Sequence, residues 1–526
     1  KRFTRTGHEK EGGFLMINII FGPPGTGKTH KLLSIVEEGL AKGIDPDQIG
    51  YFAYTRKAAN EAITRAVERF PQYDKKDFKY FRTLHSLAYL ELGLTDSSLM
   101  DDNDYKEVSD LLNVKLSNPT NKYDNYGMGW QDDKFVNIID LARIKDVSLE
   151  HQFCQRETGH LPGGFLKLRK IATGLKKYKE QNGFMDFTDM IIEFNKRKQS
   201  PKFKLLIIDE AQDLSSVQWN MVDILAQNST HTYIAGDDDQ AIFEWAGADP
   251  WRFKQQKGNR IILDQSFRVP LAVQRRADAV INRIHPDNRV QKQWQATDRE
   301  GSLKLRVNPY GHVDFLKDDW LILARTNYLL DKVEEELKTR GIFYQRHNSK
   351  SVSDRLLLAI NTWTRLTRNK TATFEGVKAM YHYMNVDVGV KYGSKTMPRA
   401  NQDKEYTYEE LKKDYGLLLS QELRWDAALD RIPPTKLAYL LAALRRNQNF
   451  NHEARVKLST IHGSKGGEAT NVLLFSDLSF KVDEEYRRNK DVERRVFYVG
   501  MTRAKNELNL VRSQTDKEFT EMFWRS

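Results

Sequence analysis

The sequence contains almost no cysteine and no long apolar run, and both shortages narrow the class of protein. Cys154 is the single cysteine among 526 residues, which excludes an internal disulfide and a zinc site built from cysteines. So little cysteine is typical of a reducing compartment. No hydrophobic run approaches the roughly 20 residues that a membrane-spanning helix requires. We therefore expect a cytoplasmic protein, prokaryotic or in a viral host, with no membrane partner.

Acidic residues are also in the minority. Asp and Glu total 72 against 83 Lys and Arg, which gives a formal net charge of +11. Such an excess favours a polyanionic partner such as nucleic acid, although a solvated basic surface gives the same count. The chain is longer than one hydrophobic core requires, so two or more domains are expected.

The first 15 residues are basic and lack the apolar core of a secretory signal. We interpret residues 1–15 as a leader that is not native and that precedes a natural start at Met16. A mitochondrial presequence is the alternative, and the acidic residues Glu9 and Glu11 disfavour it.

A glycine-rich motif follows the first apolar segment. Residues 17–21 (INIIF) predict a buried parallel strand, residues 22–29 are GPPGTGKT, and the apolar spacing after them predicts a helix. Glycines let backbone N–H groups surround phosphate oxygens, while Lys28 neutralises the β- and γ-phosphates and Thr29 offers its hydroxyl to Mg²⁺. The predicted nucleotide-binding residues are Gly22, Pro23, Pro24, Gly25, Thr26, Gly27, Lys28, Thr29 and His30.

Polar residues end two further predicted strands. Residues 204–209 (KLLIID) end on Asp209, beside Glu210, and residues 230–236 (THTYIAG) lead to Gln240. A carboxylate at a strand end can hold Mg²⁺, so Asp209 is the expected metal ligand, and Glu210 can accept a proton from the attacking water. Strands that alternate with helices predict a parallel α/β sheet with ligands at its carboxyl edge. These patterns indicate an NTPase, a class that includes kinases, GTPases, transporters and motors.

Ten segments occur in a fixed order between Gly22 and about Leu510. They are GPPGTGKT (22–29), AYTRKAANEA (53–62), FRTLHSLA (81–88), MDFTDMI (185–191), IIDEAQDLS (207–215), AGDDDQAIFEWAGADP (235–250), LDQSFR (263–268), ILARTN (322–327), VKLSTIHGSKGGEATNVLL (456–474) and ERRVFYVGMTRAKNEL (493–508). In this order they resemble the motifs of the UvrD/Rep family of superfamily 1 DNA helicases. One departure is Ala246, which stands where the family has an arginine near the DNA strand.

The resemblance implies an α/β fold with two RecA-like parallel-sheet domains, each carrying a mostly helical insertion. The first RecA-like, ATP-binding domain would comprise residues 16–88 and 181–262, with residues 89–180 inserted. The second would comprise residues 263–345 and 452–526, with residues 346–451 inserted.

The resemblance also assigns roles around the nucleotide. Lys28, Glu210, Gln240, Arg268 and Arg503 would be catalytic, Gln240 as the sensor of the γ-phosphate and the two arginines as fingers from the second domain. Thr29 and Asp209 would hold the metal. Phe267 would stack on adenine where the family usually has tyrosine, and Glu468 would lie near the ribose.

A single-strand track needs aromatic platforms for bases and polar groups for phosphates. By resemblance these are Tyr54, His85, Phe187, Phe243, Trp245, Arg325, Asn327 and His462. A place in the hydrophobic core is the alternative for each aromatic residue, and a structural hydrogen bond is the alternative for each histidine.

The resemblance implies an ATP-dependent helicase that uses ATP and Mg²⁺ and moves 3′→5′ on single-stranded DNA. Its partners would be single strands, single-strand/duplex junctions and repair or replication proteins, and it would be located with the DNA. One alternative is a translocase that strips proteins from single strands. Another is the motor subunit of a larger repair or recombination complex, or of a helicase–nuclease, although no carboxylate-rich nuclease segment follows Arg503. No residue excludes RNA as the track.

Overall fold

Contacts in the computed structural model divide the chain into two units. The structure describes residues 16–118, 132–155, 161, 163–308, 313–346, 349–397, 400–513 and 515–524. The first unit runs to Glu300 and also takes in Asn489–Thr502, and the second comprises Gly301–Arg488 and Arg503–Arg525. The predicted leader, residues 1–15, lies outside the described residues.

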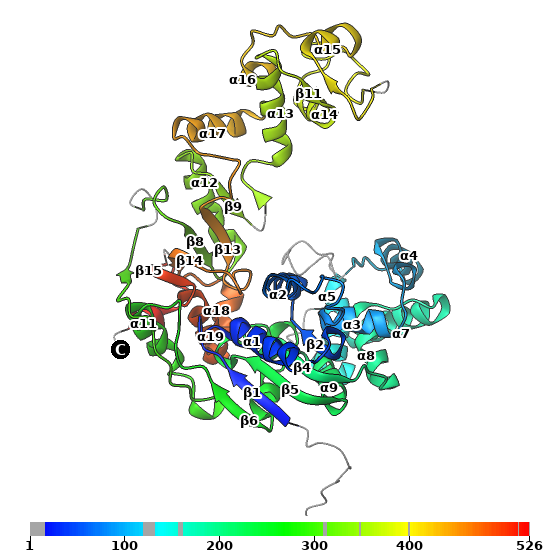
Figure 1. Cartoon of the computed structure of the whole chain (residues 1–526), viewed down its shortest axis with the longest axis vertical. Helices are drawn as coiled ribbons and strands as arrows, with labels where there is room; N and C mark the ends of the chain where they lie inside the picture. Colours follow the sequence, from blue (N-terminus) through cyan, green and yellow to red (C-terminus); the bar gives the residue numbers. More distant parts are fainter. Residues whose placement is uncertain are drawn as a thin grey trace, which may run out of the picture. The chain divides into compact units, whose positions relative to one another are not determined.

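The first unit is built on a six-stranded sheet in which all neighbouring strands are parallel (Figure 1). The strand order is β3-β2-β4-β5-β1-β6. The strands are β1 (Met16–Phe21), β2 (Ile49–Phe52), β3 (Phe81–Arg82), β4 (Phe203–Ile208), β5 (Ser229–Gly236) and β6 (Asn259–Ile262). The three strands expected from apolar runs, β1, β4 and β5, therefore lie together in the sheet.

Helices cover both faces of this sheet, which explains why its strands are apolar throughout. Successive residues of a strand point to opposite faces, and in β1 Ile19 and Phe21 belong to one core while Ile20 belongs to the other. One core includes α1 (Lys28–Ala41) and α2 (Arg56–Arg69), and the other includes α3 (Leu84–Glu91), α8 (Phe187–Arg197) and α9 (Ser216–Gln227). A sheet buried on both faces leaves its carboxyl edge for polar residues.

A helical insertion with its own core interrupts the first unit. It contains α4 (Asp102–Leu112), α5 (Asp133–Ile144), α6 (Leu149–Gln155) and α7 (Gly164–Asn182). The buried residues of α7 are Leu168, Ile171, Leu175 and Tyr178, at helical spacing. The lysines and arginines of this basic helix therefore lie outside its buried stripe.

The second unit is built on a seven-stranded sheet of order β10-β9-β13-β8-β14-β15-β7. All neighbours are parallel except β9 and β10. The strands are β7 (Ser302–Leu305), β8 (Trp320–Ala324), β9 (Tyr344–Arg346), β10 (Ser349–Lys350), β13 (Val456–Thr460), β14 (Ala469–Phe475) and β15 (Ala504–Val511). Helices α12 (Asp331–Thr339) and α18 (Phe480–Arg488) belong to the same unit.

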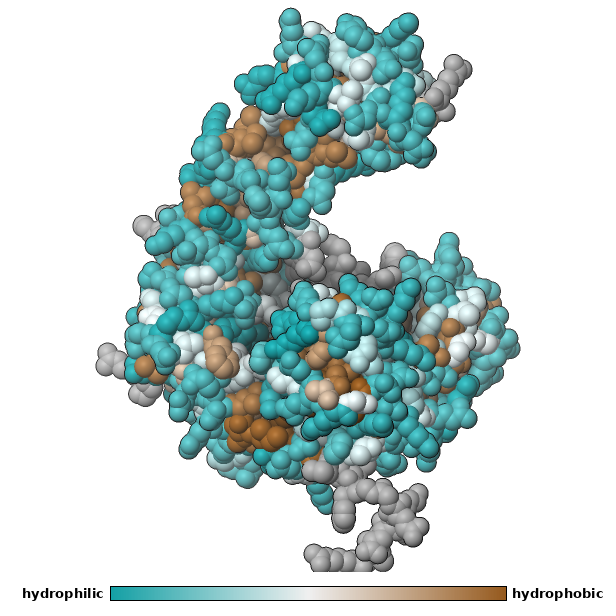
Figure 2. Space-filling model, in the orientation of Figure 1, coloured by the Kyte–Doolittle hydropathy of each residue, from teal (hydrophilic) through white to brown (hydrophobic). Residues whose placement is uncertain are grey.

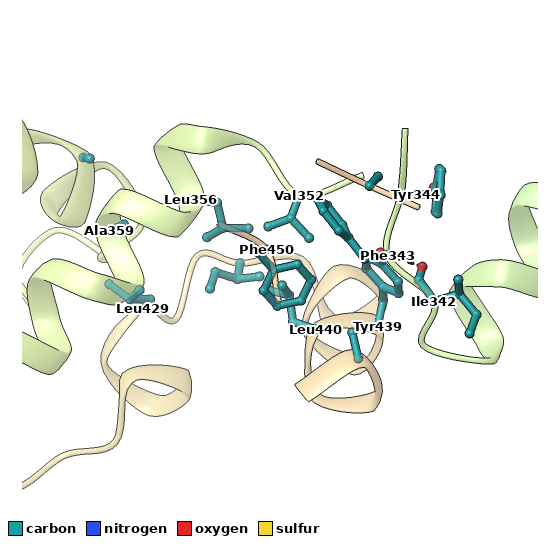
Figure 3. Close-up of a cluster of buried hydrophobic side chains, with 14 of the residues drawn as sticks. Ile342, Phe343, Tyr344, Val352, Leu356, Ala359, Leu429, Tyr439, Leu440 and Phe450 are labelled. Carbon is teal, nitrogen blue, oxygen red and sulfur yellow. Dashed lines mark hydrogen bonds between the residues drawn. The ribbon is translucent and has the colours of Figure 1, made fainter. Parts of the chain in front are cut away.

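The insertion of the second unit shares one hydrophobic core with the sheet. Its helices are α13 (Asp354–Leu366), α14 (Phe374–His382), α15 (Tyr408–Asp414), α16 (Trp425–Ala428) and α17 (Pro434–Arg445), and β11 (Ala372–Thr373) pairs with β12 (Glu405–Tyr406). Figure 3 shows Phe343, which precedes β9, together with Leu356 of α13, Leu440 of α17 and Phe450. The insertion is therefore packed onto its own unit by buried side chains.

The structure confirms the prediction of parallel α/β sheets with helical insertions but divides the chain differently. The expected boundary lay between residues 262 and 263, whereas the first unit extends to Glu300 and includes α19 (Lys490–Met501). The cause is a set of contacts between distant segments: Phe267 donates its backbone N–H to the carbonyl of Gly25 at 2.8 Å, and Arg495 donates Nε to the carbonyl of Asp238 at 3.1 Å.

The face drawn in Figure 2 is predominantly hydrophilic, as the large number of charged residues predicts. Among the described residues, no helix has the length and apolarity needed to cross a membrane.

Candidate nucleotide and nucleic-acid site

The phosphate loop joins β1 to α1 and curls around its own lysine. Gly22 donates its N–H to the carbonyl of Gly236 at 3.0 Å, which fixes the start of the loop against β5. Lys28 Nζ donates to the carbonyl of Gly22 at 3.1 Å, and a Cβ at Gly22 would lie only 2.0 Å from Lys28 Cγ. Gly27 has φ +77° and caps α1, a conformation that side chains disfavour. The loop therefore presents the N-terminus of α1, a site that favours anions.

Asp209 and Glu210 follow β4 directly and lie beside this loop. Asp209 is 4% exposed and accepts a hydrogen bond from the Tyr51 hydroxyl at 3.1 Å. Burial, followed by the charge of Glu210, raises the pKa of Asp209 to about 6. Glu210 adopts a left-handed conformation, φ +53°, with Oε1 3.6 Å from Lys28 Nζ. A buried carboxylate next to the phosphate loop is a suitable oxygen ligand for Mg²⁺, so the residues fit the metal that the sequence implied.

Gln240 lies in a short 3₁₀ turn, η5 (Asp238–Gln240), at the end of β5. Its Nε2 donates to Asp237 Oδ2 at 2.7 Å. The backbone N–H of Asp237 donates to Gln212 Oε1 at 2.9 Å, and Gln212 Nε2 donates to Glu210 Oε2 at 2.6 Å. A continuous chain of hydrogen bonds therefore joins the candidate general base to the candidate γ-phosphate sensor.

Two cations that the sequence reasoning missed hold the three aspartates of this turn. Lys292 Nζ lies 2.8 Å from Asp237 Oδ1 and 3.0 Å from Asp239 Oδ2, and it also bonds Asp238. Arg289 pairs with both oxygens of Asp239, at 2.9 and 2.6 Å. Burial by itself lowers the pKa of Lys292, but the three carboxylates outweigh it and raise that pKa. Three consecutive aspartates after a buried strand were the available signal, because buried carboxylates require cations.

Phe267 and Arg268 also lie beside the phosphate loop. Ser266 Oγ donates to the carbonyl of Pro24 at 2.8 Å, and a Cβ at Gly25 would lie 2.5 Å from Arg268 Cβ. The Phe267 ring is 73% exposed and would lie 3.7 Å from a Cβ at Gly27. An exposed ring against this loop is available for stacking on a base.

Arg503 and Glu468 come together within the second unit. Each directly precedes a strand, β15 or β14, and these strands pair. The Arg503 side chain is buried and donates Nη1 to the carbonyl of Gly467 at 3.3 Å. Glu468 is exposed and pairs with Lys505 at 2.7 Å.

Three candidate base-stacking residues of the first unit form a continuous aromatic group. The Tyr54 and Phe243 rings stack with centroids 5.9 Å apart, and the Phe243 and Trp245 centroids are 6.3 Å apart. All three side chains are half-buried. Tyr54 also packs against the hydrophobic core of the first unit, and the exposed part of each ring leaves surface on which a base could stack.

Phe187 and His85 form a second pair, with ring centroids 6.1 Å apart. Phe187 is 38% exposed and is the first residue of α8, whose N-cap Asp186 accepts two hydrogen bonds from Arg143, each of 2.7 Å. Burial, and then the charge of Arg56, lowers the pKa of His85 to about 4. His85 is therefore neutral at pH 7 and can contribute a hydrogen bond but no charge.

The remaining candidate contacts lie at the carboxyl ends of two paired strands of the second unit. Arg325 and Asn327 follow β8, and His462 follows β13. The N–H of Ile461 donates to the carbonyl of Ala324 at 3.0 Å, and Arg346 Nη2 donates to the carbonyl of Asn327 at 2.8 Å. All three candidates are half-buried.

Comparison with known proteins covers almost the whole chain. The family model described as the UvrD/REP helicase N-terminal domain matches residues 14–260, and the model of the UvrD-like helicase C-terminal domain matches residues 186–515. A probable DNA helicase II homolog of Mycoplasma pneumoniae is 24% identical, over 94% of this chain and 82% of the relative. A homolog of the same name in Rickettsia felis is 25% identical over 96% and 91%. The DNA helicase II of Haemophilus influenzae is 23% identical over 94% and 81%.

Proposed function

The chain belongs to the family of UvrD-like helicases, and from this premise we propose that the residues described above form a motor moving 3′→5′ on single-stranded DNA. The protein is an ATP-dependent DNA helicase. We also propose that it uses Mg²⁺ and that the single residues act in the roles given below. Single-strand/duplex junctions are the proposed substrate, and repair or replication proteins acting with the DNA are the proposed partners.

In the proposed hydrolysis, the residues around the phosphate loop bind the phosphates, hold the metal or activate the water. The amides of the phosphate loop and Lys28 bind the phosphates, and Thr29 and Asp209 would hold the Mg²⁺, which neutralises phosphate charge when bound. Glu210 accepts the proton of the attacking water, and Gln240, the candidate sensor of the γ-phosphate, also orients that water. Arg268 and Arg503 would stabilise the charge of the transferring phosphoryl group.

The proposal depends mainly on the contacts at the two ends of one short segment, Asp237 to Trp245. Its first residues are hydrogen bonded to Gln212 and so to Glu210, and its last residues carry the Phe243 and Trp245 rings. In the proposed motor this one segment would join the phosphate chemistry to the base-stacking group, as coupling of ATP hydrolysis to movement requires.

Two measurements test this function. ATPase activity is measured with single-stranded DNA, single-stranded RNA and blunt duplex in parallel, and we expect single-stranded DNA to give the strongest stimulation. Unwinding is then compared on duplexes with only a 3′ or only a 5′ tail, and we expect the 3′-tailed duplex to be opened. Preference for the 5′ tail would contradict the polarity, and translocation without unwinding would favour a protein-stripping translocase.

A further inference from the structure

The carboxylate of Asp237 has a different partner on each oxygen. Oδ1 accepts from Lys292 Nζ at 2.8 Å and from the backbone N–H of Asp239 at 3.2 Å. Oδ2 accepts from Gln240 Nε2 at 2.7 Å. Asp237 is fully buried and the Lys292 side chain is 1% exposed. Water therefore does not compete with these bonds, and each is strong because a charge takes part in it.

This arrangement fixes the orientation of the Gln240 amide. A side-chain amide can turn over and exchange its nitrogen and oxygen, which have opposite hydrogen-bonding roles. An ionised carboxylate oxygen can only accept hydrogen bonds. Asp237 therefore holds the Gln240 amide nitrogen on its own side and directs the amide oxygen away. An oxygen so directed can accept a hydrogen bond from a water molecule that attacks phosphate.

We propose that Asp237 and Lys292 are positioning residues for ATP hydrolysis: Lys292 fixes the Asp237 carboxylate, which in turn fixes the amide of Gln240. The inference rests on the proposed role of Gln240 in this site. Neither residue touches the nucleotide in this scheme, and both act through Gln240.

Asp237 is also connected by hydrogen bonds to Glu210, the proposed general base. Its backbone N–H donates to Gln212, whose amide donates to Glu210. Lys292, 55 positions after Asp237, therefore anchors a network that reaches both groups acting on the water. Misplacement of such groups by about 1 Å can cost about 10²-fold in rate.

The turn supplies a matched pair of variants. In Asp237→Asn the amide oxygen of the new side chain can still accept the hydrogen bonds from Lys292 and from the N–H of Asp239. Its NH₂ group then faces Gln240 Nε2, so that two donors meet. Asp238→Asn also removes one negative charge and one acceptor from this buried cluster. The donor that loses its partner is then the backbone N–H of Val290, which bonds Asp238 Oδ2 at 2.7 Å. Only the first substitution removes the hydrogen-bond acceptor of the Gln240 amide.

We expect Asp237→Asn to lower the kcat of the DNA-stimulated ATPase by about 10- to 100-fold, with the KM for ATP unchanged. Asp238→Asn should keep a kcat near that of the wild type. The melting temperatures of both variants are measured beside the kinetics. Equal kcat losses in the two variants, in proportion to their melting temperatures, would show a purely structural role and overturn the proposal.

A second pair of measurements separates action through Gln240 from general damage. In a Gln240→Ala background, Asp237→Asn should cause no further loss of kcat, because coupled residues are not additive. Multiplying losses would overturn the proposal.

Lys292 is tested with the charge balance kept. The double variant Lys292→Met/Asp238→Asn should show a lower kcat than Asp238→Asn alone, and an equal kcat would remove Lys292 from the scheme. Wild-type and Asp238→Asn turnover report independently on the proposed function, so failure of this inference and failure of the ATPase site are distinguishable.

Discussion

Tyr54 and Phe243 stack with their ring planes inclined by 20° and their centroids 5.9 Å apart. Tyr54 follows β2 and Phe243 follows β5, and these strands lie on either side of β4 in the sheet. Because carboxyl ends of parallel strands share one edge, residues far apart in the sequence meet there. Trp245 extends the stack on the Phe243 side.

Trp245→Ala should weaken binding of single-stranded DNA. Stacking of one base contributes about 1–3 kcal/mol, or roughly 5- to 150-fold in affinity. Basal ATPase without DNA should stay near the wild-type value, whereas stimulation by DNA should fall. Titration with fluorescent single strands measures the affinity.

Trp251→Ala is the matched control, because Trp251 is a 52% exposed tryptophan of the same unit, in α10 (Pro250–Gln255), without an assigned role. A variant of Trp245 that melts at a much lower temperature but binds DNA normally would place this ring in the core instead.

Lys28→Ala should abolish ATP hydrolysis and leave the fold intact. Its ammonium bonds the carbonyl of Gly22 and approaches Glu210, and the side chain fills no hydrophobic core. Turnover is measured at saturating Mg·ATP beside a melting curve, with the exposed Lys42 at the other end of α1 replaced as the control. Wild-type turnover in Lys28→Ala would contradict the proposed site.

Glu210→Gln should bind ATP but hydrolyse it slowly. The amide oxygen can still accept the hydrogen bond from Gln212, while the base is lost. General-base catalysis typically supplies about 10²–10⁴-fold. Single-turnover hydrolysis and equilibrium ATP binding are the measurements, and a loss below about threefold would assign the base to another group.

Arg503→Ala should lower kcat far more than nucleotide affinity, because a finger acts chiefly on the transition state. Since the side chain is buried and bonds the carbonyl of Gly467, the melting temperature must be measured with the kinetics. Weak nucleotide binding with normal kcat would make Arg503 a binding residue only.

His85 should make the protein less stable in mild acid. The pKa of His85 is lowered to about 4 by burial and by Arg56, whereas an unfolded histidine titrates near about 6.5. As the pH falls from 6.5 to 4, the unfolded state binds a proton that the folded state refuses, so the free energy of unfolding decreases.

Urea unfolding of His85→Gln should therefore depend less on pH in this window than unfolding of the wild type. His151→Gln, at an exposed histidine of α6, serves as the control. Equal pH dependence in wild type and His85→Gln would contradict a lowered pKa of His85.

The sequence alone predicted those features whose residues all lie in one short segment. The phosphate loop was predictable because strand, glycines, Lys28 and Thr29 are contiguous, and the apolar run before Asp209 predicted β4 (Phe203–Ile208). The order of the motifs predicted the family, and the family predicted two parallel α/β sheets with insertions. The proposed DNA contacts of individual residues remain predictions, and the variants above address some of them.

Only the tertiary structure decided the partners of residues that are distant in the sequence. Nothing in the local sequence distinguishes Lys292 from a surface lysine, but the fold buries it against Asp237. Phe267 contacts the phosphate loop through a backbone hydrogen bond to Gly25. The unit to which α19 belongs was likewise fixed by contacts such as that of Arg495 with Asp238. The physical reason is that local periodicity records which face of a segment is buried, whereas the pairing of buried charges depends on which segments meet, and that is set by the packing of the whole unit.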